Sequence, residues 1–320
     1  MRRRTALATS LLAVGAIALT ACSGGGGGGS SAGTGRGDIT IWYSNNEQEV
    51  EWGKQMVEAW NADHPDEQIK GQEIPAGKSS EEVIGAAITA GNAPCLIYNT
   101  APSAVGQFEK QGGLVDLSKI EDGKATFADQ AGYDVADFWA TMYKDDYSSK
   151  EQFQGDSFAQ GYAAMAIVGP WAVSVYKDVN WGSVPVPTKD GADPKDVWTF
   201  SDAKNIGLYS ACKNQATAWD VLKFSTSEEQ DQKLLEITGQ MPFRKDLQTT
   251  YADYFAANPA YQAFGDQASR TVEVPPGPNT VQMLQAFRDA WSESVIFGKG
   301  DTKTALDDAA KKIDTIAQQP

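Results

Sequence analysis

Strand-like and helix-like segments alternate along the first part of the chain. "DITIWY" (38–43), "QIKGQEIP" (68–75) and "CLIYNT" (95–100) are short runs rich in β-branched and aromatic residues. Helical patterns separate them, one starting at Asn46 and Glu49 in a capping-box-like arrangement and one over 79–91. This order is typical of a parallel sheet, in which ligands bind beyond the carboxyl ends of the strands. We therefore expect "YSNNE" (43–47) and "NTAPS" (99–103) at the rim of one crevice.

The rest of the chain continues in the same α/β manner. We expect strands at "MAIVGPW" (165–171), at "NWGSVPVPT" (180–188, an edge or crossing strand because of its prolines) and at "AKNIGLYSA" (203–211). We expect helices over 127–143, 156–164, 215–226, 227–239, 280–298 and 301–318. Some 280 residues follow the leader, about the size of two lobes.

The amino terminus directs the chain out of the cytoplasm. Three arginines at positions 2–4 precede an apolar stretch that suits a signal peptide over 1–21. "LTAC" (19–22) resembles the bacterial lipobox, in which Cys22 carries the lipid; the alternative is an ordinary secretion signal with a chance cysteine. Residues 22–37 are mostly glycine and serine, as in a flexible tether. We expect a protein lipid-anchored at the extracellular face of the cell membrane.

Composition excludes several ligand classes. The net charge is −15 before the three leader arginines are removed, so nucleic acid and anionic headgroups would be repelled. The single histidine, His64, lies in a polar turn, and no nucleotide-binding or metal-binding motif is present. We expect no metal site and no cofactor. Carboxylates are plentiful, but no pattern singles out a catalytic pair.

Two cysteines remain in the mature chain after Cys22. Cys95 and Cys212 can form a disulfide in an oxidising exterior, but the sequence alone does not show that they meet.

Several segments together resemble one family. "ITIWYSNNEQ", "FAQGYAAMAIVGPWAV", "WGSVPVPT", "TGQMPFRKDL" and "GKGDTKTALDDAAKKI" are similar to extracellular solute-binding proteins of carbohydrate ABC transporters, which include maltose-binding proteins. The resemblance covers nearly all of 38–320, and its most specific element is the Gly-Pro-Trp ending at Trp171. It implies a two-lobed clamp of periplasmic-binding-protein type II, each lobe a mostly parallel sheet flanked by helices. The amino-terminal lobe would hold 38–118 and 204–245, and the other lobe 120–203 and 246–320.

The resemblance also implies ligand-binding residues. Trp171 matches the aromatic that stacks on the sugar, with packing between the lobes as the alternative. Ser44, Asn46 and Glu47 match polar positions that contact ligand hydroxyls, although Asn46 can simply cap a helix. Four further candidates are Asn99 and Thr100 on the rim, Arg244, which binds ligand or forms a lobe–lobe salt bridge, and Tyr43, whose role is ambiguous.

The chain departs from the family in two ways. One is Cys95, because the family commonly has an acidic residue directly after Pro94. The chain also lacks about a hundred residues that the family usually has, and the shortfall falls around 118–122. The missing interval normally holds a lobe-crossing strand and aromatic residues of the sugar platform, so the carboxy-terminal lobe is expected to lack a strand or more. Sugar binding could be weakened, altered or lost as a result.

Taken together, the sequence predicts a non-enzymatic, monomeric binding protein that closes on a sugar, a glucoside or small oligosaccharide, and delivers it to an ABC permease. Two other classes remain open: a surface lipoprotein acting as a sensor or adhesin, and a carbohydrate-active hydrolase.

Overall fold

The computed structural model describes residues 35–77, 79–114, 125, 127–151, 153–188, 193–201, 203–242, 244–273, 277 and 279–319. The predicted signal peptide, Cys22 and the tether up to residue 34 lie outside the described residues, and so does the interval 118–122. Among the helices of the described part, none has the length and apolar character needed to cross a bilayer.

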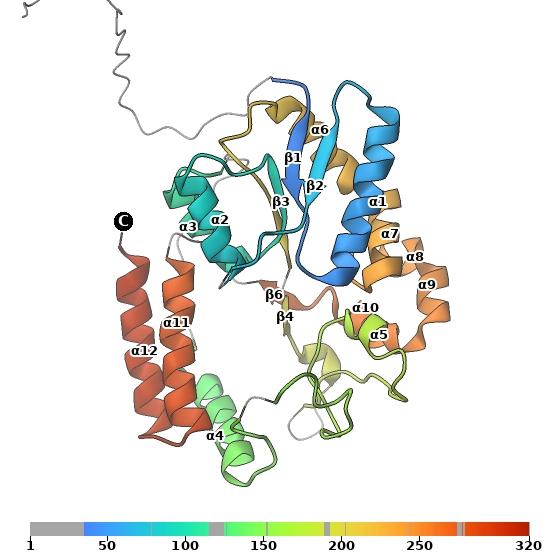
Figure 1. The fold of residues 1–320 in the computed structure, drawn as a ribbon. Helices are drawn as coiled ribbons and strands as arrows, with labels where there is room; N and C mark the ends of the chain where they lie inside the picture. Colours follow the sequence, from blue (N-terminus) through green and yellow to red (C-terminus); the bar gives the residue numbers. More distant parts are fainter. Residues whose placement is uncertain are drawn as a thin grey trace, which may run out of the picture.

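Four strands form the sheet of the amino-terminal lobe, in the order β2-β1-β3-β5 (Figure 1). Three of them are parallel: β1 (Ile39–Trp42), β2 (Ile69–Gln72) and β3 (Leu96–Thr100). The fourth, β5 (Asn205–Leu208), runs antiparallel to β3. The sequence predicted a strand at each of these four places. A helix follows each parallel strand: α1 (Glu47–Asp63), α2 (Ser80–Thr89) and α3 (Pro102–Lys110).

Helices cover both faces of this sheet. Two further helices belong to the lobe: α6 (Gln215–Ser225) and α7 (Glu228–Thr238). α1, α6 and α7 lie on one face and α2 and α3 on the other (Figure 1). Because side chains alternate along a strand, Ile41 and Leu96 pack on the first face, while Trp42 and Ile97 pack on the second. The lobe therefore has two apolar layers with a buried sheet between them.

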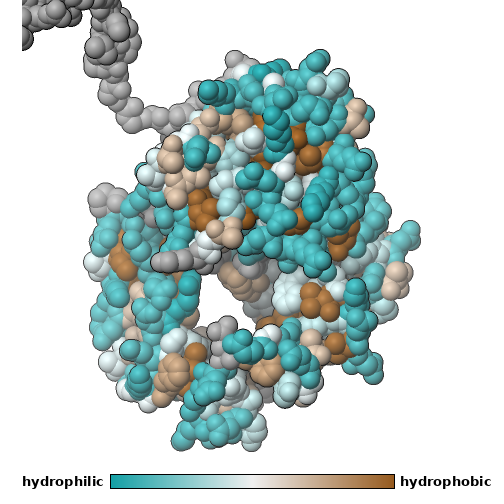
Figure 2. Space-filling model, in the orientation of Figure 1, coloured by the Kyte–Doolittle hydropathy of each residue, from teal (hydrophilic) through white to brown (hydrophobic). Residues whose placement is uncertain are grey.

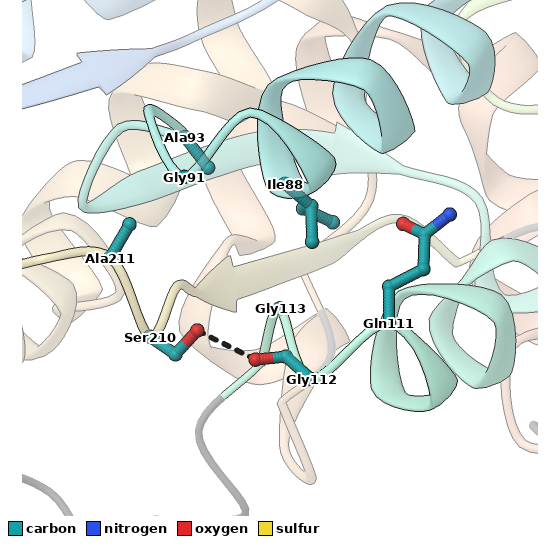
Figure 3. A pocket seen from close by; sticks show the side chains of 8 residues that line it. All are labelled: Ile88, Gly91, Ala93, Gln111, Gly112, Gly113, Ser210 and Ala211. Carbon is teal, nitrogen blue, oxygen red and sulfur yellow. Dashed lines mark hydrogen bonds between the residues drawn. The ribbon is translucent and has the colours of Figure 1, made fainter. Parts of the chain in front are cut away.

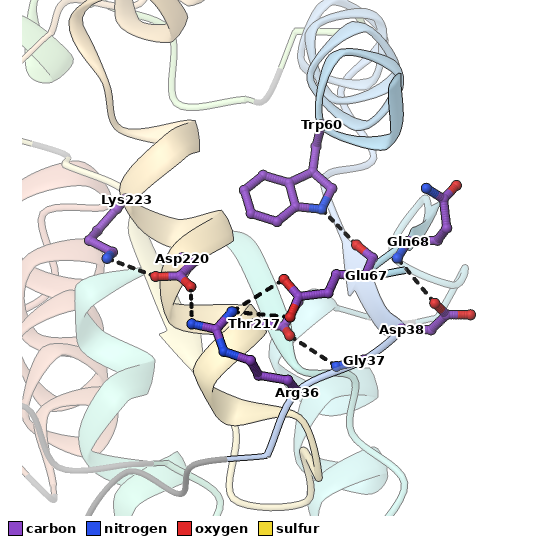
Figure 4. Close-up of polar contacts among 9 residues, drawn as sticks. All are labelled: Arg36, Gly37, Asp38, Trp60, Glu67, Gln68, Thr217, Asp220 and Lys223. Atoms are coloured by element: carbon purple, nitrogen blue, oxygen red, sulfur yellow. Dashed lines mark hydrogen bonds and ion pairs between the residues drawn. The ribbon is translucent and has the colours of Figure 1, made fainter. Parts of the chain in front are cut away.

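The last residues of the predicted tether are part of this lobe. Arg36 forms ion pairs with Glu67 at 3.0 Å and with Asp220 of α6 at 2.7 Å (Figure 4). The backbone N–H of Ala216, in the first turn of α6, donates to the carbonyl of Gly35 at 2.9 Å and so is capped from outside the helix. The prediction of a free tether up to residue 37 is therefore wrong for residues 35–37, since ion pairs and a helix cap hold them.

A disulfide joins Cys95, directly before β3, to Cys212, four residues after β5. The two cysteines are 117 residues apart in sequence, and both are buried. The pairing that the sequence left open is thus formed, and it crosslinks the two distant segments that make the amino-terminal lobe.

The remaining described elements are those that the sequence assigns to the carboxy-terminal lobe, apart from the segment around residue 245. Its helices are α4 (Gln130–Lys144), α5 (Ala172–Val175), η2 (Pro194–Asp196), α8 (Leu247–Thr250), α9 (Ala252–Ala257), η3 (Pro259–Tyr261), α10 (Gln262–Gln267), α11 (Thr280–Trp291), the π-helix η4 (Ser292–Ile296) and α12 (Thr302–Ala317). Its strands β4 (Thr199–Ser201) and β6 (Thr271–Glu273) form a two-stranded parallel sheet. The sequence predicted α4, α11 and α12 but neither of these strands.

Three sequence predictions fail in this lobe. Residues 156–164 form turns rather than a helix, and neither 165–171 nor 180–188 is a strand. The physical reason is visible in the apolar run: Met165 is 84% and Ile167 is 76% exposed, so no described strand lies beside them to pair with or cover them. A run with strand composition forms a strand only where a neighbour supplies hydrogen bonds.

Other large apolar side chains of this lobe are exposed in the same way, namely Val184, Val186, Trp198, Phe200 and Val272. Figure 2 shows an opening through the molecule between the α4–α11–α12 side and the remainder of the lobe. The carboxy-terminal lobe thus has two separate small cores instead of one continuous core.

One of these cores consists of α4, α11, η4 and α12, around Ala136, Val295 and Leu306. The other consists of α5 and α8 to α10 packed against Leu235 at the end of α7. The predicted lobe boundary at residue 245 falls inside this second core, and the boundaries stay a prediction. The second core brings α5, and with it Trp171, against the amino-terminal lobe.

Candidate functional site

Polar side chains gather where β1 and β3 end. Ser44 follows β1, is fully buried, and lies at the centre of this group. Its hydroxyl donates to the carboxylate of Glu49 at 2.5 Å. It accepts from the backbone N–H of Asn46 at 3.1 Å and from the side-chain amide of Asn99 at 3.0 Å. The two predicted rim segments, 43–47 and 99–103, therefore meet at the hydroxyl of Ser44.

Asn99 has an unusual backbone conformation. Its φ is +58°, in the left-handed region that asparagine tolerates better than most residues. The amide oxygen of its side chain is shielded from solvent and has no hydrogen-bond partner. An unpaired buried acceptor of this kind is rare in folded proteins and marks a place where another group is needed.

Glu49 links this group to the end of α7. Its second carboxylate oxygen accepts from the side-chain amide of Gln240 at 3.3 Å. The sequence pattern predicts only a capping box for Glu49, in which its carboxylate would accept from the Asn46 backbone. In the structure the Asn46 N–H goes to Ser44 instead, so the carboxylate is available to bind Ser44 and Gln240.

Trp171 lies at the start of α5 and is 37% exposed. Its ring packs edge-on against Tyr176, with the ring centroids 6.3 Å apart. Tyr176 in turn packs against Phe158 and, at 85° between the planes, against Trp181. The indole therefore rests on an aromatic cluster of its own lobe and still offers part of its surface.

A hydrogen-bonded carboxylate holds this aromatic cluster in place. The hydroxyl of Tyr176 donates to Asp156 at 2.6 Å. Burial and this carboxylate raise the pKa of Tyr176 to about 12, and the same hydrogen bond lowers the pKa of Asp156. At neutral pH the pair is thus a neutral phenol donating to a carboxylate.

The hydroxyl of Ser174 on α5 lies among three acceptors and can donate to one of them. They are the carbonyl of Trp171 at 2.8 Å, the carbonyl of Thr238 on α7 at 2.9 Å and the side-chain oxygen of Gln48 on α1 at 3.1 Å. Gly239, the left-handed C-cap of α7, lies next to this segment, since a Cβ atom there would be 3.3 Å from the carbonyl oxygen of Pro170 and 3.6 Å from the Trp171 Cα. The backbone of Trp171 therefore lies beside the end of α7, from which Gln240 reaches Glu49.

Two of the predicted ligand residues are buried in the amino-terminal lobe. Tyr43 is 6% exposed, and its ring fills the space over Gly53 and Gly71, where a Cβ atom would approach it to 2.7 and 2.6 Å. Thr100 is 5% exposed, and its hydroxyl donates to the carbonyl of Asn205 in β5 at 2.9 Å. The structure gives both side chains a packing role in the sheet.

Arg244 forms an ion pair, but within the amino-terminal lobe rather than between lobes. Its guanidinium binds Asp231 of α7 at 2.7 Å and donates to the carbonyl of Thr226 at 2.8 Å. The lobe–lobe salt bridge proposed for Arg244 is therefore wrong, because the partner carboxylate lies 13 residues upstream on α7.

The remaining candidates lie at the start of α1. Asn46 caps the helix, since its side-chain oxygen accepts from the N–H groups of Gln48 and Glu49 at 3.0 and 3.2 Å. This is the structural alternative that the sequence analysis left open. Glu47 is the first residue of α1 and is exposed on the rim.

Sequence reasoning missed Gln48, Ser174 and Gln240. Gln48 directly follows the rim segment 43–47 but carries no motif. Ser174 lies three residues beyond the expected strand that ends at Trp171, and Gln240 follows the helix-ending Gly239. Of the three, only Gln240 had a sequence signal: it directly follows a glycine that ends a helix, so its side chain lies beyond the last turn of that helix.

Two cavities lie at opposite ends of the amino-terminal sheet. One of about 350 Å³ adjoins the rim at Asn45, Glu73 and the start of α2. The other, of about 200 Å³, lies near the disulfide between the ends of α2 and α3; its lining residues, which include Ile88, Gln111 and Ser210, are drawn in Figure 3. The first extends the rim beside Ser44, whereas the second is remote from Trp171.

The chemistry of the site is that of hydrogen bonding and aromatic contact. In the described part of the chain, no group of three or more His, Cys, Asp or Glu side chains is arranged to hold a metal ion. A partly exposed indole suits the apolar C–H face of a ligand, and amide and carboxylate groups suit its hydroxyl edge.

Comparison of the whole structure identifies the fold. The GacH receptor of Streptomyces glaucescens, solved unliganded and with acarbose, superposes with a TM-score of 0.74 over 89% of this chain and 99% of that one, at 16% identity. The fold is that of type II sugar-binding proteins. The fold class expected from the sequence is thereby confirmed.

Sequence comparison points to the same proteins. The family of bacterial extracellular solute-binding proteins matches residues 119–263. The galactooligosaccharide-binding protein of Bacillus subtilis is 30% identical over 158 residues, 48% of this chain and 36% of its own length. The maltooligosaccharide ABC transporter solute-binding lipoprotein of Streptococcus pneumoniae TIGR4 is 28% identical over 172 residues, 51% of this chain and 38% of its own length.

The resemblance to maltose-binding-protein-like solute-binding proteins is thus confirmed, in fold over most of the chain and in sequence over about half of it. The chain spans well under half the length of the two relatives named above. The matching family and these relatives are binding proteins rather than enzymes, which is the class that the sequence analysis favoured.

Proposed function

We propose that this chain is the substrate-binding component of an ABC importer, anchored through a lipid on Cys22 at the extracellular face of the membrane. It captures a neutral sugar, a glucoside or short oligosaccharide, between its lobes as a monomer and delivers it to the permease. The observation that carries this proposal is that α5, which begins after Trp171, packs against the end of α7, where Gln240 binds Glu49 of the polar group around Ser44.

This arrangement suits both sides of a sugar ring. The indole of Trp171 offers a flat apolar surface for the C–H face, and its aromatic backing limits its movement. The amide and carboxylate groups offer partners for the hydroxyl edge. Because the two sets come from different lobes, a ligand that touches both favours the closed state by its extra affinity for that state.

The names of the relatives support a carbohydrate ligand and a transport role. One binds galactooligosaccharides, and another is a solute-binding lipoprotein of a maltooligosaccharide ABC transporter. The lipobox around Cys22 supports the anchor. A Cys22→Ser variant should appear in the culture medium and fail to incorporate radiolabelled palmitate.

A sugar panel tests the proposal. The mature protein is screened by thermal shift against maltose, maltotriose, trehalose and lactose, and the best sugar is titrated by calorimetry. We expect one sugar to raise Tm by several degrees and to bind with micromolar Kd, about −8 kcal/mol. If no sugar of the panel changes Tm, the result would favour a sensor or adhesin. Release of free monosaccharide from the sugars would mean that the protein is a hydrolase.

Tryptophan variants test the site itself. Trp171→Ala should abolish sugar-dependent fluorescence quenching. Trp219→Ala is a matched control, because Trp219 is similarly exposed, at 42%, and lies on α6, which contributes no residue to the proposed site. Equal quenching in wild type and Trp171→Ala would remove Trp171 from the site.

A further inference from the structure

The hydrogen bonds of Ser44 determine which way the Asn99 side chain points. A serine hydroxyl has one proton and can accept two hydrogen bonds. A carboxylate can only accept, so the proton of Ser44 goes to Glu49. One acceptor position is filled by the backbone N–H of Asn46. The atom of Asn99 that lies 3.0 Å from Ser44 must then be the donating NH₂ group.

The amide oxygen of Asn99 is consequently left as a free acceptor. It has no hydrogen-bond partner and is shielded from solvent. The left-handed backbone at Asn99, with φ at +58°, fixes where the side chain begins, and Ser44 fixes how it is rotated. Since Gln240 holds Glu49 from the other side, the hydrogen bonds run without a break from Asn99 to the end of α7.

We propose that Ser44 is a positioning residue, and that it presents the carbonyl oxygen of Asn99 to the bound sugar, which must donate a hydroxyl proton at that point. This inference rests on the proposed function, and it gives Ser44 a different role from the ligand contact expected from the sequence. Ser44 is fully buried and has no hydrogen-bonding capacity left for a ligand.

The surrounding charges agree with a ligand that donates. Neither 43–49 nor 99–104 contains a lysine or arginine, whereas Glu47 and Glu49 are acidic. An anionic group of the ligand would find no cation on these two segments. A neutral hydroxyl can donate to Asn99 and needs no counter-charge.

Fluorinated sugars test the direction of this hydrogen bond. The panel sugar with the largest thermal shift is compared with its monodeoxyfluoro analogues, because fluorine at a hydroxyl position cannot donate. At one ring position the fluorine should weaken binding to the wild type about ten-fold or more. In Asn99→Gly the same substitution should cost less than about three-fold, since the acceptor is gone. Glycine is chosen because it adopts φ +58° without strain.

Two further variants separate positioning from folding. Asn99→Asp retains an acceptor oxygen and should keep the fluorine penalty, whereas in Ser44→Ala the amide is free to rotate and the penalty should fall. A Ser44→Ala protein with an unchanged fluorine penalty, at any Tm, would overturn the positioning role. If a sugar binds but its fluorine penalties are the same in wild type and Asn99→Gly, only this inference fails. If no sugar binds the wild type, the proposed function fails and this inference with it.

Discussion

Removing the Cys95–Cys212 disulfide should destabilise the amino-terminal lobe by about 5 kcal/mol. The crosslink closes a loop of 117 residues. In the chain-entropy description a loop of about 100 residues costs the unfolded chain about 4.7 kcal/mol of freedom at 25 °C. The loop contains the whole of the segment 120–203 predicted for the carboxy-terminal lobe, so the unfolded chain gains much freedom on reduction. At about 2–4 °C per kcal/mol for a chain of this size, Tm should fall by about 10 °C or more.

The measurement is urea unfolding of the wild type with and without a thiol-free reductant, followed by far-UV circular dichroism. The double variant Cys95→Ala/Cys212→Ala controls for the reductant, because its transition should not respond to it. Both reduction and the double variant should lower the midpoint and raise the slope, since an uncrosslinked chain exposes more surface. If the free energy of unfolding changes by less than about 1 kcal/mol, the unfolded chain already keeps these two segments together.

Three further outcomes follow from individual contacts. Thr100→Val should cost about 1 kcal/mol of stability by leaving the carbonyl of Asn205 unpaired, yet leave sugar affinity unchanged in calorimetry; a loss of affinity would return Thr100 to the site. Burial, and then Asp156, raise the pKa of Tyr176 to about 12, so the stability that its neutral hydroxyl provides is complete below pH 10 and is lost as pH rises toward 12. The stability difference between wild type and Tyr176→Phe should therefore shrink over that range in urea titrations, and a constant difference would contradict it. The exposed apolar side chains of the carboxy-terminal lobe should bind the dye ANS without sugar, and absence of dye fluorescence would show them covered in solution.

The amino-terminal lobe could be predicted from sequence because its signals are local and strong. Ile41 and Trp42 alternate toward two apolar layers, and the helices between the strands start at recognisable caps such as Asn46 and Ser79. Much of the carboxy-terminal lobe could not be predicted from sequence. The apolar run at 165–168 has strand composition, but the described structure offers it no neighbouring strand. β4 and β6 are three residues each, too short to leave a periodic pattern.

The site was predictable in location but less so in its details. Residue order placed the rim at the ends of β1 and β3, and Asn99 is there. The sequence could not reveal which side chains already have their hydrogen-bonding groups occupied by other residues of the protein. Ser44 is saturated and Arg244 is paired with Asp231 because of tertiary geometry. The partners of Glu49 lie 5 residues before it and 191 residues after it, and no local pattern relates those positions.

The attachment of residues 35–37 determines how force enters the molecule. Any pull on the amino terminus is first met by the ion pairs of Arg36 and the cap on α6, ahead of the first residue of β1. Glu67 and Asp220 share that load between segments far apart in the chain. If Cys22 carries the proposed lipid, tension from the membrane therefore reaches the sheet at the amino-terminal end of β1, whereas Ser44 and its polar group lie beyond the carboxyl end of that strand.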